Sequence, residues 1–98
     1  MITAFVLIRA ERGQVGALAQ TLAELPGVAE VYSVSGEHDL IAIARVAAPE
    51  DLATLVTERL AVLRGIVSTQ TVLAFRAYSR HDLDSLFDVG LGTPGSVR

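Results

Sequence analysis

An internal repeat at a spacing of 38 residues, free of gaps, constrains the fold of this chain more than any other feature. The segment LAELPGV at 22–28 recurs as LAVLRGI at 60–66. The same shift aligns further apolar positions: Phe5 with Ile43, Ile8 with Val46, and Leu18 with Val56. Each copy has the pattern of a strand, a helix and a second strand. Two copies in 98 residues predict one α+β domain with ferredoxin-like βαββαβ topology, in which both helices cover one face of a four-stranded antiparallel sheet.

Hydrophobic periodicity and turn residues place the elements within each copy. Short apolar or alternating runs predict strands at 2–8, 28–34, 40–46 and 66–75. Apolar residues at helical spacing predict one helix from Gln14 up to Pro26 and another from Pro49 up to Gly65.

A further segment follows the repeat. Ser79 and Asp82 resemble a capping box ahead of an apolar stripe, which predicts a short C-terminal helix. The stripe consists of Leu83, Leu86 and Phe87. The chain therefore divides into a folded domain at 1–78 and a C-terminal helix with a frayed tail at 79–98.

Both faces of the sheet are predicted to be apolar. In the first and third strands, one parity is Ala4, Val6, Ile8, Leu40, Ala42 and Val46, and the other is Phe5, Leu7, Ile41 and Ile43. Only one set can lie under the helices, and the pattern leaves open which one does. Large side chains left in water would forgo about 1.5 to 3 kcal/mol each. We therefore expect a second copy of the chain to cover the open face, in a homodimer or a larger homo-oligomer.

Composition excludes several classes of function. The chain has no cysteine, which excludes disulfides, thiolate metal sites and cysteine nucleophiles. The net charge is −3 and the eight basic residues, all arginine, are scattered, so direct binding to nucleic acid is not expected. No apolar run approaches the roughly 20 residues that span a bilayer, and the run at 2–8 lacks a basic leader. We therefore expect a cytoplasmic protein that makes no membrane contact.

No group of residues predicts catalysis or a metal site. His38 and His81 are the only histidines, and neither has a metal-binding spacing. His38 is adjacent to Asp39, but neighbouring strand residues point to opposite faces and no serine lies in a nucleophile-elbow setting. We therefore expect no catalytic residue, no metal and no cofactor.

The turn SGEHD at 35–39 holds the densest polar chemistry in the chain. Backbone N–H groups around Gly36 can bind a carboxylate, and Asp39 can meet an ammonium, so the turn is a candidate site for a zwitterion. The alternative is a solvated hairpin turn in which Gly36 takes a positive φ and Asp39 closes an Asx-type bond. Thr69 and Thr71 share one face of the last strand and, taken by themselves, are ordinary strand residues.

Two segments resemble, in order and spacing, the effector-binding half of the Lrp/AsnC (leucine-responsive, feast/famine) transcription regulators, called the RAM domain. The segment 31–41 carries a G-x-x-D turn between the second and third strands, with a histidine before the aspartate. The segment 63–72 carries L-x-G-I followed by a T-x-T strand. The resemblance covers about residues 2–75. Because the sequence starts directly at the first strand, it is similar to the stand-alone RAM form, which lacks the helix-turn-helix.

The resemblance implies a regulatory, non-enzymatic module that binds an amino-acid effector. In the family, RAM domains dimerise through the open sheet face, and dimers assemble further, often to octamers, with the effector bound between dimers near the G-x-x-D turn. Carried over, the ligand-binding residues are Gly36, Glu37, His38 and Asp39, with Thr69 and Thr71 nearby. A full-length Lrp/AsnC regulator is an implied partner. Two alternatives stay open: a cofactor-free ferredoxin-like dimeric enzyme, such as a monooxygenase or isomerase, and a purely structural oligomerisation domain.

Overall fold

The computed structural model describes residues 1–80 of the chain. In chain order, the elements in this range are β1 (Ile2–Ala10), α1 (Val15–Ala23), β2 (Val28–Ser33), β3 (Leu40–Val46), α2 (Pro49–Thr54), the π-helical turn η1 (Leu55–Arg59) and β4 (Ile66–Leu73). The predicted bounds agree with these to within about two residues, except that the second helix, predicted up to Gly65, ends its helical winding at Arg59.

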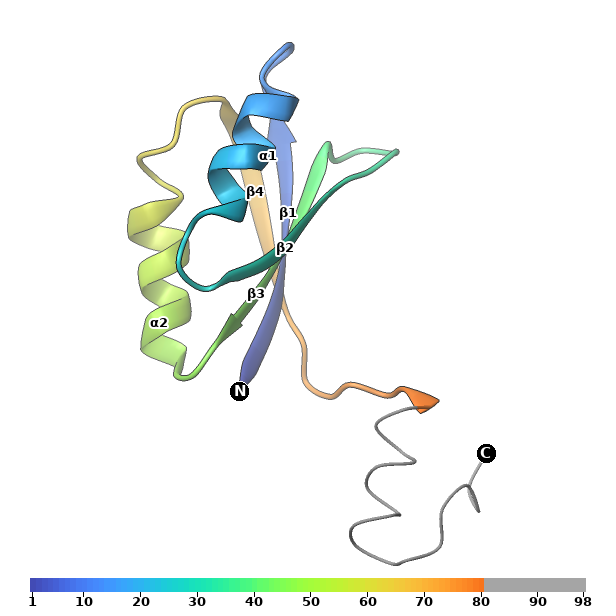
Figure 1. Cartoon of the computed structure of the whole chain (residues 1–98), viewed down its shortest axis with the longest axis vertical. Helices are drawn as coiled ribbons and strands as arrows, with labels where there is room; N and C mark the ends of the chain where they lie inside the picture. The colour runs from blue at the N-terminus through green and yellow to red at the C-terminus, as the bar shows by residue number, and fades with distance from the viewer. Residues whose placement is uncertain (81–98) are drawn as a thin grey trace, which may run out of the picture.

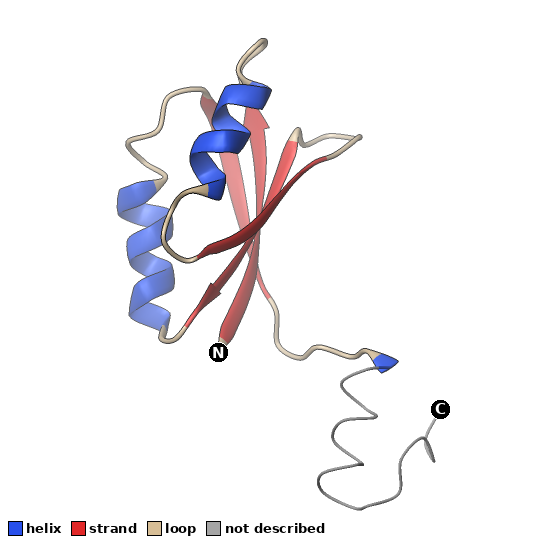
Figure 2. Cartoon of the chain, viewed as in Figure 1, coloured by secondary structure: helices blue, strands red, loops and turns tan. Residues whose placement is uncertain are grey.

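The four strands form one antiparallel sheet in the order β2-β3-β1-β4. The central strands are therefore β3 and β1, the first strand of each repeat copy, and β2 and β4 lie at the edges. Figures 1 and 2 show α1 and α2 on the same side of the sheet. The ferredoxin-like α+β fold predicted from the repeat is confirmed.

The helix-covered face of the sheet carries the even-numbered residues of the two central strands. The buried apolar residues are Ala4, Val6, Ile8, Leu18, Leu22, Leu40, Ala42, Ala44, Val46, Leu55 and Leu60. Ala4 and Ala44 pair across β1 and β3 and pack with Leu55, so a leucine of the second helical segment fills the space above the small residues. Small residues on the sheet under large residues on the helices allow close packing of the two layers. This packing also answers the question of parity that the sequence left open.

The other face of the sheet is apolar at its centre. Leu7 pairs with Ile41, and Phe5 lies between Ile43 on one side and Val72 on the other. We call these five residues the open apolar face. Phe5 is 37% exposed and Val72 43% exposed. One chain therefore carries the apolar face for which a second copy is expected.

Both repeat copies end their helical segment with a glycine in the left-handed region. Gly27 has φ +92° and Gly65 has φ +94°. A Cβ added at Gly27 would lie 3.1 Å from Val46 Cγ1, and one added at Gly65 would lie 3.1 Å from Gln14 Cβ. Backbone conformation and limited space both favour glycine at these positions. The two glycines thus return the chain to the sheet in the same way in each copy.

The second helix differs from the first in its winding. The Leu60 N–H donates to the Leu55 carbonyl over 2.9 Å, which is a step of five residues in place of the usual four. Leu55 and Leu60 are both buried. The π-helical turn therefore brings two leucines five positions apart onto one face. The sequence pattern predicts this helix but not the π-helical turn within it.

Beyond β4, residues 74–80 run away from the sheet (Figure 1). The Ala74 N–H still donates to the Thr3 carbonyl over 2.9 Å, after which Phe75 and Tyr78 are 91% and 76% exposed. Ser79 lies in this segment. The rest of the predicted capping box and its apolar stripe, with most of the predicted C-terminal unit at 79–98, fall outside the described residues.

Candidate functional site

The turn at 35–39 joins β2 to β3 at the end of the sheet where β1 ends and β4 begins (Figure 1). Gly36 has φ +102°, and an added Cβ would meet nothing within 4 Å. Glycine is therefore favoured here by the backbone conformation and not by lack of space. The open surroundings leave room for a ligand beside the turn.

Consecutive backbone N–H groups of residues 35–38 have no acceptor within the described part of the chain. The N–H groups on either side are paired: Val34 donates to the Asp39 carbonyl over 3.0 Å, and Asp39 donates to the Ile8 carbonyl over 2.8 Å. The turn thus holds its shape through its ends while the N–H groups between them stay available. Successive free N–H groups in a turn can bind an anion.

Asp39 also accepts a long-range hydrogen bond that the sequence did not predict. Its Oδ2 accepts a hydrogen bond from the Ala10 N–H over 2.8 Å, across 29 residues of sequence and in a partly buried setting. The register of β1 against β4 shifts between Arg9 and Ala10, and the carboxylate satisfies an N–H at this irregularity. The Asx-type bond considered from the sequence is replaced by this longer-range bond. Oδ1 accepts no hydrogen bond from residues 1–80.

The two residues between Gly36 and Asp39 present their side chains to solvent in different degrees. Glu37 is exposed, whereas His38 is half-buried. Neither side chain makes a hydrogen bond or an ion pair with another described residue. Both are therefore available to a ligand or to a neighbouring copy.

Thr69 and Thr71 lie on the helix-covered side of β4, opposite Ile8 and Val6. Both are exposed because β4 is an edge strand. Thr69, but not Thr71, lines a cleft of about 310 Å³ between β4 and the end of the second helical segment, with Leu60 and Ser68 among the other lining residues. The whole strand β1 separates the threonines from β3, where the turn ends, which is two strand spacings or roughly 10 Å. A single chain thus brings the turn residues together but does not bring the two threonines to them.

A polar cluster that sequence reasoning missed borders the open apolar face. The Tyr32 hydroxyl donates to Glu30 Oε2 over 2.7 Å, and Arg45 Nη1 lies 3.2 Å from Glu30 Oε1. The Tyr32 hydrogen bond, followed by Arg45, lowers the pKa of Glu30 below its ordinary 4.5. The same hydrogen bond raises the pKa of Tyr32 above its ordinary 10.0. The signal in the sequence was the alternation that places Glu30 and Tyr32 on one face of a strand.

Neither a metal site nor a membrane span is found in residues 1–80. No group of three or more histidine, aspartate or glutamate side chains gathers in this range in a way that could hold a metal ion. In the same range, no helix is both long and apolar enough to cross a membrane.

Comparison with known proteins gives consistent relatives. The family model of the Lrp/AsnC ligand binding domain matches residues 3–83. An uncharacterized HTH-type transcriptional regulator of Pyrococcus furiosus is 37% identical over 76 residues, which are 74% of this chain and 51% of the regulator. This chain therefore spans about half the length of the curated relatives it matches.

Solved structures agree with the sequence matches. The crystal structure of a Thermus thermophilus protein has a TM-score of 0.76 at 53% identity, covering 81% of this chain and 99% of that one. A transcriptional regulator of Neisseria meningitidis, solved in complex with L-Met, has a TM-score of 0.72 at 16% identity, covering 80% of this chain and 52% of that one. At that identity the likeness shows the fold alone.

Proposed function

Because this chain belongs to the Lrp/AsnC ligand-binding domain family, whose matched relatives are HTH-type transcriptional regulators, we propose that it is a regulatory module that binds an amino-acid effector at the turn 35–39. The observation that carries this proposal is the run of free backbone N–H groups at 35–38 beside the Asp39 carboxylate. That the Neisseria meningitidis regulator of the same fold was solved with L-Met supports the choice of an amino acid.

The two charges of an amino acid match the two halves of this turn. The effector carboxylate accepts hydrogen bonds from the N–H groups at 35–38. The effector ammonium meets Asp39, whose Oδ1 is unused while Oδ2 holds the Ala10 N–H. Charge-assisted hydrogen bonds are stronger than neutral ones, so both contacts favour a zwitterion over an amine or an acid alone. Glu37 and His38 are placed to contact the effector side chain.

A second copy of the chain is needed to complete this site. Thr69 and Thr71 do not reach the turn of their own chain, and the turn itself is open to solvent on the Gly36 side. We propose that dimers form through the open apolar face, which leaves the turn at the end of the sheet free. Further assembly of dimers then encloses the effector between turns and β4 strands of different copies. A two-fold axis through the open apolar face brings the same surface of both copies together, as in most homodimers.

A thermal-shift screen of the twenty amino acids tests the effector site, since a ligand that binds only the folded protein raises the melting temperature. The decisive variant is Asp39→Asn. Asparagine keeps a side-chain oxygen that can accept the Ala10 N–H, so the fold is retained, but it removes the charge that meets the ammonium. We expect the melting temperature of the free protein to change little and the ligand-induced shift to become clearly smaller than in the native chain.

Glu24→Gln is the matched control, because it removes a carboxylate at the exposed C-cap of α1, remote from the turn. This variant should respond to the effector like the native chain. A ligand-induced shift as large in Asp39→Asn as in the native chain would place the effector site elsewhere. No shift with any amino acid would favour the purely structural oligomerisation domain.

Several finer expectations stay predictions. They are the absence of catalysis, the cytoplasmic location, the absence of direct DNA binding, the number of copies in the assembly, and a full-length Lrp/AsnC regulator as partner. No observation in residues 1–80 favours a monooxygenase or isomerase over a regulatory module, since the half-buried His38 lies in a turn and not in a cavity between the helices and the sheet.

A further inference from the structure

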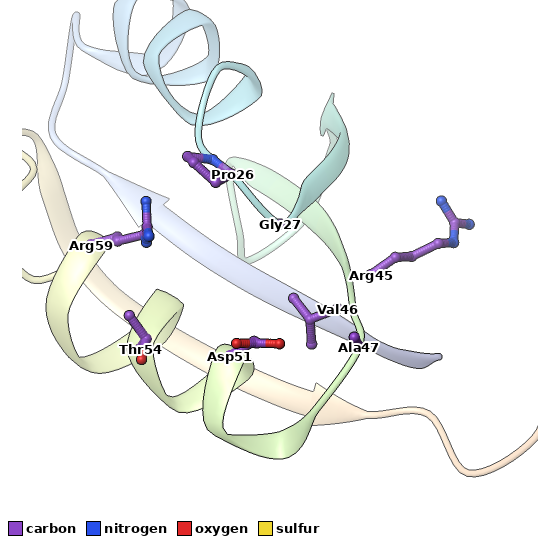
Figure 3. Close-up of a pocket in the computed structure, with 8 residues that line it drawn as sticks. All are labelled: Pro26, Gly27, Arg45, Val46, Ala47, Asp51, Thr54 and Arg59. Atoms are coloured by element: carbon purple, nitrogen blue, oxygen red, sulfur yellow. The ribbon is translucent and has the colours of Figure 1, made fainter.

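A polar cleft lies at the end of the domain opposite the turn 35–39. It has a volume of about 280 Å³ and is bordered by the turn that follows α1, by the end of β3 and by the second helical segment. The lining residues include Pro26, Gly27, Val46, Asp51, Thr54 and Arg59, and Figure 3 shows them around the cleft. None of the residues assigned to the effector site contributes to it.

The π-helical turn determines which charge faces this cleft. Each residue of an α-helix rotates the chain by about 100°, so the extra residue in a π-helical turn sets the following side chains back by roughly that angle. As a result Arg59, and not its neighbour Glu58, lines the cleft together with Thr54 and Asp51. In Figure 3 the Arg59 side chain extends from the helix toward Pro26. Its guanidinium makes no ion pair or hydrogen bond with other residues of the described range.

Thr54 offers a second free group at the same place. The hydroxyls of Thr21 and Thr57 each donate to the carbonyl four residues earlier, on Ala17 and Ala53, which is the usual bond of a helical threonine. The half-buried Thr54 makes no such bond within residues 1–80. Its hydroxyl can therefore donate to a ligand held by Arg59.

Asp51 brings a negative charge to the other part of the cleft. Its Oδ2 accepts the Ala48 N–H over 3.2 Å at the start of α2, and its Oδ1 accepts no hydrogen bond in the described chain. Arg45, although it also borders the cleft, turns its guanidinium away toward Glu30 on the open face of the sheet. The cleft therefore presents one free cation, one hydroxyl and one acceptor from the described residues to a ligand.

From this arrangement we infer that the cleft is a second small-ligand site, separate from the proposed effector site, for a small carboxylate that carries a hydrogen-bond donor next to the carboxyl group. Arg59 and Thr54 hold the carboxylate, and Asp51 accepts from the donor. Both 2-amino acids and 2-hydroxy acids have this chemistry. Pro26 and Gly27 form the facing wall, and Gly27 keeps it open because any side chain there would press on Val46.

The test is an NMR titration of the full chain with L-alanine, L-lactate and propionate, which share a carbon skeleton and differ only in the ammonium, hydroxyl or hydrogen at C2. The readout is the backbone amide signals of Gly27, Ala47 and Thr54 for the cleft and of Gly36 for the turn. We expect L-alanine and L-lactate to shift the cleft signals and propionate to bind more weakly. Arg59→Gln should weaken binding at the cleft about tenfold or more, as expected for loss of a charge-assisted contact.

Three variants keep the two sites distinguishable. Glu58→Gln changes a neighbouring exposed charge outside the cleft and should leave the affinity unchanged. Asp39→Asn should leave the cleft response intact, so a failure of the effector site does not imitate a failure here. Asp51→Asn keeps an acceptor for the Ala48 N–H and should reduce the preference for L-alanine over propionate. Cleft signals that do not move, that move equally in Arg59→Gln, or that respond equally to all three acids would overturn the inference.

Discussion

In both copies of the repeat a buried leucine and a glycine with positive φ follow in the same order, but the helices before them are wound differently. At equivalent positions, Leu22 and Leu60 are buried, and Gly27 and Gly65 share a positive φ and a contact distance of 3.1 Å to an added Cβ. In α1 the preceding buried leucine, Leu18, is four residues before Leu22, whereas in the second copy Leu55 is five residues before Leu60.

This difference teaches which parts of a repeat are fixed and which can vary. The fold requires a buried leucine ahead of the turn and a glycine at the turn, and both copies keep them. The winding of the helix between buried positions is less constrained, because a π-helical turn can absorb one extra residue without moving the core. In the second copy Arg59 then lines the cleft of about 280 Å³, whereas Thr21, at the equivalent position of α1, lines a smaller cleft of about 200 Å³.

The largest expected effect comes from exchanging the two windings. Inserting an alanine between Gln20 and Thr21 gives α1 the leucine spacing of the second copy, with no other adjustment to receive it. Leu22 would then turn away from the core. We expect the free energy of unfolding to fall by about 2 to 5 kcal/mol, as it does when a buried leucine is removed. Deleting Glu58 gives the second copy the leucine spacing of α1. We expect this deletion to change the free energy of unfolding by no more than about 1 kcal/mol.

Urea denaturation of both variants measures these changes. Far-UV circular dichroism of the folded baseline shows whether helix content is kept. If the deletion is as destabilising as the insertion, the π-helical turn is itself a source of stability, and the two windings are not interchangeable solutions to the same packing.

A smaller effect is expected at the two glycines. Gly27→Ala should cost more than Gly65→Ala, because the added methyl group meets the buried Val46 in one case and the exposed Gln14 in the other. Gly13→Ala is the control, since Gly13 has φ +82° with open space around it. Gly13→Ala should lower the free energy of unfolding only by the cost of the positive φ, about 1 to 2 kcal/mol. Gly27→Ala should lower it by about 1 kcal/mol or more beyond that. Thermal unfolding of the three variants gives the order, and equal losses would contradict the role assigned to the space at Gly27.

The smallest effect concerns an asymmetry between the copies on the open side of the sheet. The repeat spacing places Ser68 and Gln70 where the first copy has Glu30 and Tyr32, so only the β2 edge has the acid with its two donors. Because the folded pKa of Glu30 is lowered, the stability from this group is complete above pH 4.5 and is lost as the pH falls through the lowered folded value. Tyr32→Phe removes the main cause of the lowering.

We therefore expect the pKa of Glu30 to rise toward 4.5 in Tyr32→Phe, measured by the pH titration of its side-chain carboxyl carbon in NMR. Tyr78→Phe, which changes an exposed tyrosine beyond β4, is the control and should leave the titration unchanged. A Glu30 titration that does not move would show that Arg45, not Tyr32, is the principal partner of this carboxylate.

Most of the fold could be predicted because its determinants are local or repeated. The helical spacing of Leu18 and Leu22, the glycines at 27 and 65 and the 38-residue shift each indicate the same topology. The inward parity could not be predicted, since Phe5 and Val6 are both apolar and only the packing of helix leucines over alanines distinguishes them. The π-helical turn was hidden because Val56 and Leu60 also satisfy an ordinary four-residue step.

The polar residues of the candidate site can be read from the sequence, but the contacts that position them cannot. The polar residues of the turn are visible in the sequence, whereas the bond from Ala10 to Asp39 joins positions 29 residues apart and depends on the register of β1. The separation of Thr69 from the turn likewise follows from the strand order, which places β1 between them. The cleft at Arg59 depends on helix winding, which no single residue type signals.

The strand order also fixes how far the start of β1 and the end of β4 lie from the turn 35–39. β1 begins, and β4 ends, at the end of the sheet opposite the turn 35–39 (Figure 1). A strand of nine residues is roughly 30 Å long, so a partner domain or an affinity handle attached next to Ile2 would be beyond the reach of a molecule bound at the turn. An effector bound at the turn, as proposed above, would then act on this end of the domain only through the strands or through contacts between copies, and a probe fixed at either end of the described chain would not touch the ligand.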